Sequence, residues 1–111
     1  MDIVFGSREL ETLCHDDKLA TRTLGAQSAR KLRARLDDLA AAACLAVAPK
    51  LPGRFHSLTG DRKGQFAFHL QDGRRLVVEP ANNPMPLRTD GSLDLNAVTA
   101  VRVVFIGDYH D

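Results

Sequence analysis

Two polar segments of the 111-residue sequence carry the residue types that chemistry on a substrate requires. The first, residues 54–64, combines His56 with basic side chains and two turn glycines. The second, residues 108–111, places polar and titratable side chains directly after an apolar run. Histidine transfers protons near neutral pH, and Arg and Lys stabilise anions. Both segments are therefore candidates for a functional site, with an exposed linker or tail as the alternative.

The charge distribution favours an anionic partner. The sequence has 15 Lys and Arg, 14 Asp and Glu, and a net charge of +1. Between residues 30 and 75, ten basic residues stand against only four acidic ones, so this central block carries +6. A basic region of this kind suits a polyanion such as RNA or DNA. The alternative is an ordinary solvated surface of charged side chains.

The N-terminal half predicts one strand and two helices. The apolar run 3–5 indicates a strand, and Ser7 is suited to cap a first helix that runs to about Leu24. A second helix is expected from Ala26. Its apolar positions recur with helical spacing and share one face; they are Leu32, Leu36, Leu39 and Ala43.

The C-terminal half changes to the alternation of strands. Residues 65–70 and 75–79 predict a hairpin, and residues 98–106 predict a last strand at the centre of a sheet. Residues 80–96 form a long loop, a length that tends to be functional. We therefore expect one α+β domain over residues 1–111. Its N-terminal strand and two helices pack on a mostly antiparallel sheet that three C-terminal strands complete.

Several other classes of function are disfavoured. No segment approaches the roughly 20 apolar residues of a membrane span, and the N-terminus does not resemble a secretory signal. With only two cysteines, the cytoplasm is the expected compartment and no membrane partner is expected. Cys14 and Cys44 lack the signature of a nucleophile and are expected to pack as small apolar residues. Gly60 and Gly64 lack P-loop spacing, which disfavours nucleotide binding.

The histidines do not show the spacing of a metal site. His56 and His110 with Asp108 have no short ligand spacing, so we expect neither a metal nor another cofactor. His69 lies in the middle of an expected strand, and His15 lies beside acidic residues. We interpret these last two as structural or surface residues.

Taken together, the two polar segments resemble a known family. Residues 51–64, which read LPGRFHSLTGDRKG, resemble the His-x-Leu-x-Gly-Asp region of HigB-type toxins. These are the plasmid-maintenance killer proteins of the RelE/ParE superfamily. Arg75-Leu76 resembles the start of a strand in that family, and residues 107–110, GDYH, resemble its terminal Asp-Tyr-His. The order of elements is also similar, so the resemblance covers nearly the whole chain.

The resemblance implies the toxin of a type II toxin–antitoxin system. Such toxins are ribosome-dependent mRNA endonucleases that need no metal, and an antitoxin, usually with a helix-turn-helix domain, neutralises them. The implied partners are therefore the ribosome, mRNA and a cognate helix-turn-helix antitoxin. In the reaction, the ribose 2′-OH attacks the adjacent phosphorus and leaves a cyclic phosphate and a free 5′-OH. The step needs a base, an acid and cations near the phosphate.

The resemblance also assigns residue roles. The catalytic positions are His56, Asp108, Tyr109 and His110, and the RNA-phosphate-binding positions are Arg62, Lys63 and Arg75. The two histidines would be base and acid, in either order. Asp108 would orient a histidine or carry a proton, and Tyr109 would position or stack on a base.

The chain departs from the family in two places. Phe66 stands where many members have Trp, and residues 80–96 replace a short hairpin. We expect this loop to border the site formed by His56 and residues 108–110, and folding not to depend on it. Two other functions stay open, a non-catalytic ParE-like toxin that inhibits a protein such as gyrase, and an inactive module that binds only its antitoxin.

Overall fold

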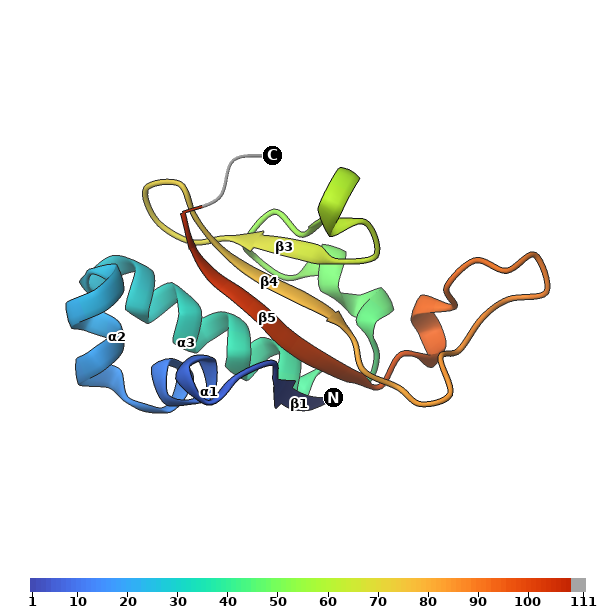
Figure 1. The fold of residues 1–111 in the computed structure, drawn as a ribbon, viewed down its shortest axis with the longest axis horizontal. Helices are drawn as coiled ribbons and strands as arrows, with labels where there is room; N and C mark the ends of the chain where they lie inside the picture. The colour runs from blue at the N-terminus through green and yellow to red at the C-terminus, as the bar shows by residue number, and fades with distance from the viewer. Residues whose placement is uncertain (109–111) are drawn as a thin grey trace.

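The computed structural model describes residues 1–108 and builds them around a five-stranded sheet of order β1-β5-β4-β3-β2 (Figure 1). The strands are β1 (Asp2–Phe5), β2 (His56–Ser57), β3 (Phe66–His69), β4 (Arg74–Pro80) and β5 (Ala100–Asp108). β1 pairs with β5 in parallel, and every other pairing is antiparallel. The α+β fold, the β3–β4 hairpin and the central place of the last strand are thereby confirmed.

Three helices connect β1 to the rest of the sheet: α1 (Arg8–His15), α2 (Asp17–Leu24) and α3 (Ala26–Ala41). The prediction of one helix up to Leu24 is wrong, because Asp16 has extended backbone angles. Its side chain accepts a hydrogen bond from the amide of Leu19 at 3.0 Å and so starts a new helix. Ser7 caps α1 as expected, by accepting from Leu10. No helix within residues 1–108 is long and apolar enough to cross a bilayer.

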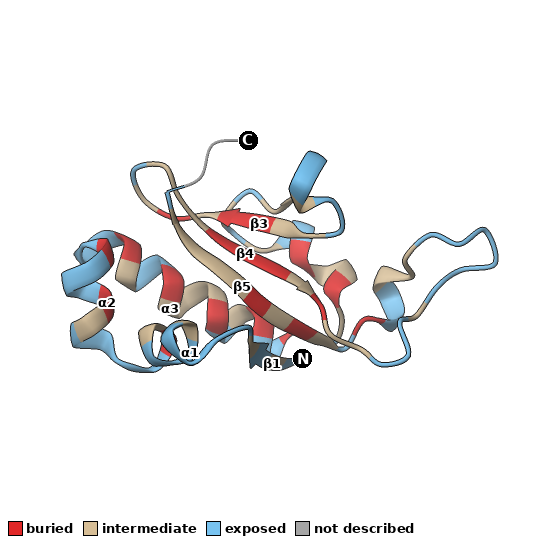
Figure 2. Ribbon diagram, viewed as in Figure 1, coloured by how far each residue is buried: buried red, intermediate tan, exposed pale blue. Residues whose placement is uncertain are grey.

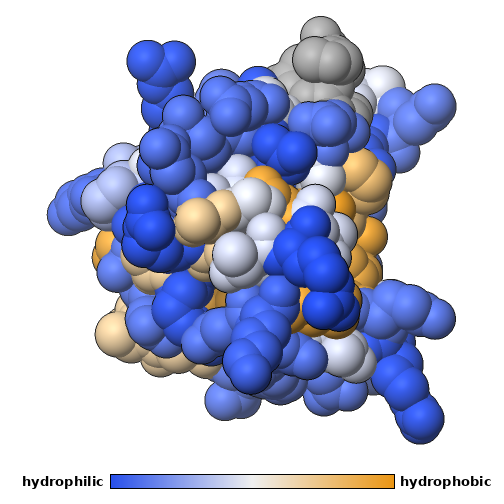
Figure 3. Space-filling view, turned by 90° about the vertical axis from the view of Figure 1, so that its left-hand side faces the viewer, coloured by the Kyte–Doolittle hydropathy of each residue, from blue (hydrophilic) through white to orange (hydrophobic). Residues whose placement is uncertain are grey.

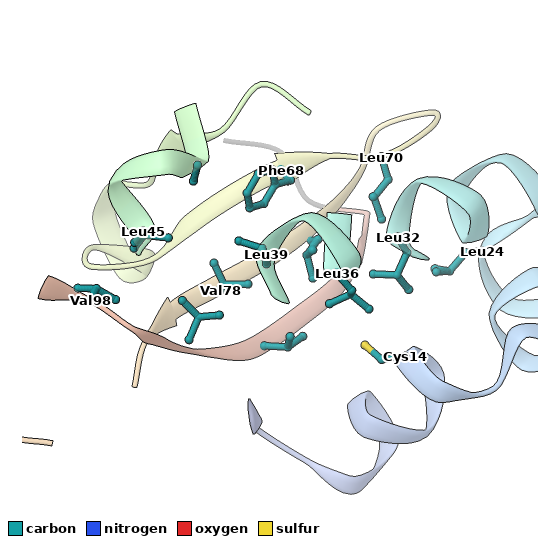
Figure 4. Close-up of a cluster of buried hydrophobic side chains, with 14 residues drawn as sticks. Cys14, Leu24, Leu32, Leu36, Leu39, Leu45, Phe68, Leu70, Val78 and Val98 are labelled. Atoms are coloured by element: carbon teal, nitrogen blue, oxygen red, sulfur yellow. The ribbon is translucent and has the colours of Figure 1, made fainter. Parts of the chain in front are cut away.

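The main core lies between α3 and one face of the sheet (Figures 2 and 4). Leu32, Leu36 and Leu39 on α3 are buried, as their spacing predicts. They pack against the inward side chains of the strands, which include Phe68, Leu76, Val78, Val101 and Val103. Ala43 was expected on the same helical face, but α3 ends at Ala41 and Ala43 is exposed.

The N-terminal ammonium group ties β1 to the end of α3. The amine of Met1 donates to the carbonyl oxygens of Leu39, Ala40 and Ala42 at 3.0, 2.9 and 2.6 Å. The last carbonyls of a helix have no partner inside the helix and carry its partial negative charge. The ammonium therefore satisfies and stabilises this helix end.

The opposite face of the sheet holds a second, smaller apolar cluster. Leu58, Ala67 and Val77 are buried there, with Val104 and Phe105 packed against them. The register between β4 and β5 shifts at Val77/Val78, so Val104 is an additional residue. A bulge of this kind re-aims side chains, and here two successive residues join the same cluster. We call this side of the sheet the open face.

Residues 81–99 form an arm between β4 and β5 that projects from one end of the sheet (Figure 1). Its outer part is a small hairpin, in which Leu87 bridges Leu93 and the amide of Arg88 donates to the carbonyl of Ser92 at 2.7 Å. A short 3-10 helix, η3 (Leu95–Ala97), leads into β5.

The expectation that this segment borders Asp108 is wrong, and its independence from the fold stays a prediction. The segment leaves β4 after Pro80, which pairs with Val101, whereas Asp108 pairs with Arg74 at the other end of the same two strands. The arm therefore does not border Asp108. At its base, Leu93 and Leu95 pack against the main core.

Leu95→Ala should lower the free energy of unfolding by about 1–2 kcal/mol, since a partly buried leucine contributes less than a fully buried one. The matched variant Leu87→Ala should change it by less than about 0.5 kcal/mol, because that side chain is 60% exposed. Urea denaturation of both variants measures the difference. Equal effects would contradict the division of the arm into a packed base and an exposed tip.

Candidate functional site

The strand register brings several of the expected site residues to the open face. His56 is opposite Ala67, Ala67 is opposite Val77, and Val77 is opposite Phe105. One step along the strands, His69 is opposite Arg75, which is opposite Gly107. Residues directly opposite one another point to the same side of an antiparallel sheet. His56, His69 and Arg75 therefore share the open face.

His56 lies on β2, a two-residue strand that the sequence did not predict. Its Nδ1 is 2.9 Å from the carbonyl oxygen of Arg54. Because a carbonyl oxygen only accepts, Nδ1 is the donor in this hydrogen bond, and in the tautomer that makes it the other ring nitrogen, Nε2, is the acceptor. Arg54 supplies that carbonyl from a left-handed backbone, with φ 54°. A left-handed residue other than glycine costs free energy and is often found at functional sites.

His69 contacts His56. The sequence analysis interpreted His69 as a structural or surface residue and did not predict this contact. The two ring centroids are 5.3 Å apart, and the planes meet at 64°. The contact follows from the register, because His69 is two residues beyond the partner of His56 on the neighbouring strand. Diagonal neighbours at this offset are within reach of ring side chains. Recognising β2 in the sequence would have been enough to find this pair.

Arg75 presents a donor that has no acceptor among residues 1–108. Its Nε is buried and has no hydrogen-bond partner there, while its Nη1 donates to the carbonyl of Arg74 at 3.2 Å. A buried donor left without a partner costs about 1–3 kcal/mol. An anionic ligand at this position would remove that cost, as the assignment of Arg75 to phosphate binding requires.

Arg62 is held in place by a chain of polar contacts. It lies in the short 3-10 helix η2 (Gly60–Arg62), and its guanidinium carbon is 4.7 Å from the centre of the Phe105 ring. Its Nη1 donates to Gln65, Gln65 donates to Glu79, and Arg102 bonds the other oxygen of Glu79 at 2.8 Å. The sequence did not single out the last three residues. Their contacts orient two arginines over the open face.

The remaining predicted residues lie apart from this group or outside the described chain. Lys63 directly follows η2 and is exposed. Asp108 ends β5 opposite Arg74. Because alternate residues of a strand point to the same face, Asp108 shares its face with Ile106, which packs on the main core. The structure therefore does not place Asp108 in the row of His56. Tyr109 and His110 lie outside the described residues.

The end of the molecule that carries α2 and the turn between β3 and β4 presents a mainly hydrophilic surface (Figure 3). Lys31 at this end is exposed, and its ammonium bonds the side-chain oxygen of Gln71 at 2.7 Å. Arg30 is exposed as well, whereas the side chain of Arg35 on the same helix is only 12% exposed. Within residues 1–108, no three His, Cys, Asp or Glu side chains are grouped as a metal site requires.

Comparison with solved structures finds a likeness that extends over nearly the whole chain. The YoeB/ParE toxin from Agrobacterium tumefaciens is 14% identical in sequence and superposes with a TM-score of 0.62. The match covers 99% of this chain and 100% of that one. The chain has the fold of a YoeB/ParE toxin. No protein-family model matches the sequence, and the comparison with curated proteins gives no match.

Neither cysteine belongs to this site. Cys14 on α1 is 3% exposed, and Cys44 precedes the 3-10 helix η1 (Leu45–Lys50) and is partly exposed. Burial raises the pKa of the Cys14 thiol from 9.0 to about 11, against a smaller lowering effect of Arg33. The thiol therefore stays protonated at neutral pH, and a thiolate nucleophile is not formed there.

The raised pKa of Cys14 predicts a loss of stability at high pH. The unfolded chain releases this proton near pH 9 and the folded chain near pH 11, so the contribution is complete below pH 9 and is lost as the pH rises to 11. Between pH 8.5 and 11, the wild type should lose about 2–3 kcal/mol more than Cys14→Ala in urea denaturation. Cys44→Ala, the control, should behave as the wild type. The same pH dependence in Cys14→Ala and the wild type would contradict the assignment.

Proposed function

We propose that this chain is the toxin of a toxin–antitoxin pair, of the HigB type, and that it cleaves mRNA on the ribosome. The fold it shares with a YoeB/ParE toxin supports the class of protein. The observation that carries the chemistry is the hydrogen bond from His56 Nδ1 to the carbonyl of Arg54, because it leaves Nε2 as the proton acceptor of the ring. A helix-turn-helix antitoxin would be the partner that neutralises the chain.

The geometry supports a division of roles in RNA cleavage. His56 Nε2 takes the proton of the ribose 2′-OH as the 2′-oxygen forms a bond to phosphorus. The bond from phosphorus to the 5′-oxygen breaks, and an acid returns a proton to that oxygen, which leaves a 2′,3′-cyclic phosphate and a 5′-OH. We assign the acid to His110, on the resemblance of its segment alone. Tyr109 keeps the base-stacking role proposed from the same segment, and Asp108, which does not share the face of His56, would orient His110 instead.

The arginines of the open face supply the positive charge that this reaction needs. Charge grows on the non-bridging phosphate oxygens in the transition state, and preorganised donors stabilise it most in a site with little water. Arg75 offers the buried Nε without a partner in residues 1–108, and Arg62 is already oriented by Gln65 and Phe105. Lys63 adds an exposed cation directly after η2.

Replacement of His56 tests the proposal. His56→Asn keeps a side-chain amide that can donate to Arg54 but removes the base, so cleavage of mRNA on programmed ribosomes should fall by about 10²–10⁴. Mapping of RNA 5′ ends measures the rate. His15→Ala is the matched control, because His15 is exposed on α1 and contacts only the edge of Phe5 among the ring contacts found within residues 1–108.

Two results would contradict the proposal, and they differ in meaning. Undiminished cleavage by a folded His56→Asn variant would remove His56 from the reaction. Growth inhibition by the wild type without any RNA cleavage would instead indicate a toxin that acts by binding a protein target.

A further inference from the structure

Beside the histidine pair lies a basic hollow that the sequence did not reveal. It has a volume of about 390 Å³ and lies where α3, the turn at residues 52–54 and the end of β3 meet. The lining residues are Lys31, Arg35, Pro52, Gly53, Arg54, His69 and Leu70. Three of these carry a permanent positive charge and none is a carboxylate. Such a hollow is suited to an anion.

The walls of the hollow are fixed by specific contacts. The amide of His69 donates to the carbonyl of Gly53 at 2.6 Å, which joins the turn to β3. Gly53 has φ 110°, and a Cβ there would be 3.1 Å from both Arg35 and Phe68. Only glycine fits this close approach without strain. On the other side, the hydroxyl of buried Ser28 bonds both the amide and the carbonyl of Gln71 and holds α3 to the β3–β4 turn.

Two of the three cations keep their charge available for a ligand. The Arg35 guanidinium pairs with Asp38 at 3.1 Å and is largely buried, so its charge is balanced within the protein. Lys31 bonds only the neutral amide oxygen of Gln71 among the side-chain bonds described, and Arg54 is exposed. Lys31 and Arg54 are therefore the groups that a bound anion would contact first.

The hollow is continuous with the candidate catalytic group through two shared residues. Arg54 lines the hollow, and its carbonyl accepts a hydrogen bond from His56. His69 lines it as well, and its ring contacts His56. An anion in the hollow would therefore contact two residues that also contact His56. A substrate that places one phosphate at the reacting position and a second nearby is a nucleic acid strand.

We propose that this hollow binds a backbone phosphate of the RNA substrate next to the cleaved bond, through Lys31 and Arg54. The inference rests on the proposed RNA cleavage and adds a phosphate subsite to it. It differs from the phosphate-binding set Arg62, Lys63 and Arg75, which lies on η2, directly after it, and on β4.

The test compares two pairs of substitutions that remove the same charges. Lys31→Gln with Arg54→Gln alters the hollow, and Lys18→Gln with Arg22→Gln removes one Lys and one Arg from exposed positions of α2. Binding is measured to a single-stranded 2′-O-methyl RNA oligonucleotide, which cannot be cleaved through a 2′-OH, over a range of salt concentrations. A polyglutamate peptide serves as a second anionic probe, and thermal unfolding checks each variant.

The variant of the hollow should bind the RNA on the order of tenfold more weakly than the α2 control at low salt. Its log–log salt dependence should be shallower by about 1.4, which is about 0.7 for each lost contact to a single strand. Equal RNA binding by the two double variants, or a loss confined to polyglutamate, would overturn the phosphate subsite. If the double variant of the hollow unfolds, Lys31→Gln alone should lower the slope of the salt dependence by about half as much. A salt dependence equal to that of the wild type would then overturn the subsite.

Cleavage by the wild type separates this inference from the proposed function. If the wild type cleaves ribosome-bound mRNA while the hollow variant binds RNA as the control does, only the subsite is wrong. If the wild type neither binds nor cleaves RNA, the proposed function and the subsite are both wrong.

Discussion

The packing of α3 on one face of the sheet is the constraint on which the candidate site depends. Leucines of α3 bury the inward side chains of β3, β4 and β5, among them Phe68, Leu76 and Val103. Successive residues of a strand point to opposite faces, so burying one set commits the alternate set to the open face. A slip of one residue would bury Arg75 and expose Leu76. The hydrophobic core thus determines which polar groups can meet a substrate.

Much of this fold follows from local patterns in the sequence. The helical spacing of Leu32, Leu36 and Leu39 predicts both α3 and its buried face, and the alternation on either side of residues 71–73 predicts the hairpin. What the patterns miss is set by single side-chain contacts. The cap by Asp16 divides the first helical region, and the bulge at Val104 shifts the register of β5. A hydrophobic periodicity is averaged over many residues, so it does not reveal a single capping side chain or a single additional residue in a strand.

The candidate site was predictable only in part, because most of it depends on residues far apart in the sequence. His56, Arg62 and Arg75 were found from a motif, and the register places His56 and Arg75 on the open face. The pairing of His56 with His69 requires β2, a strand of two residues that is too short to give a pattern. The basic hollow joins α3 to the turn after η1 and to β3, so no local segment contains its signal.

The central claim is that the open face cleaves RNA by attack of the ribose 2′-OH. The most direct measurement uses two mRNAs on programmed ribosomes, identical except for a 2′-deoxy sugar at the cleaved nucleotide. The account predicts that the normal mRNA gives a 2′,3′-cyclic phosphate and a 5′-OH, and that the deoxy sugar abolishes cleavage at that bond. Cleavage of the deoxy mRNA at the same bond, or products with a 5′-phosphate, would contradict it.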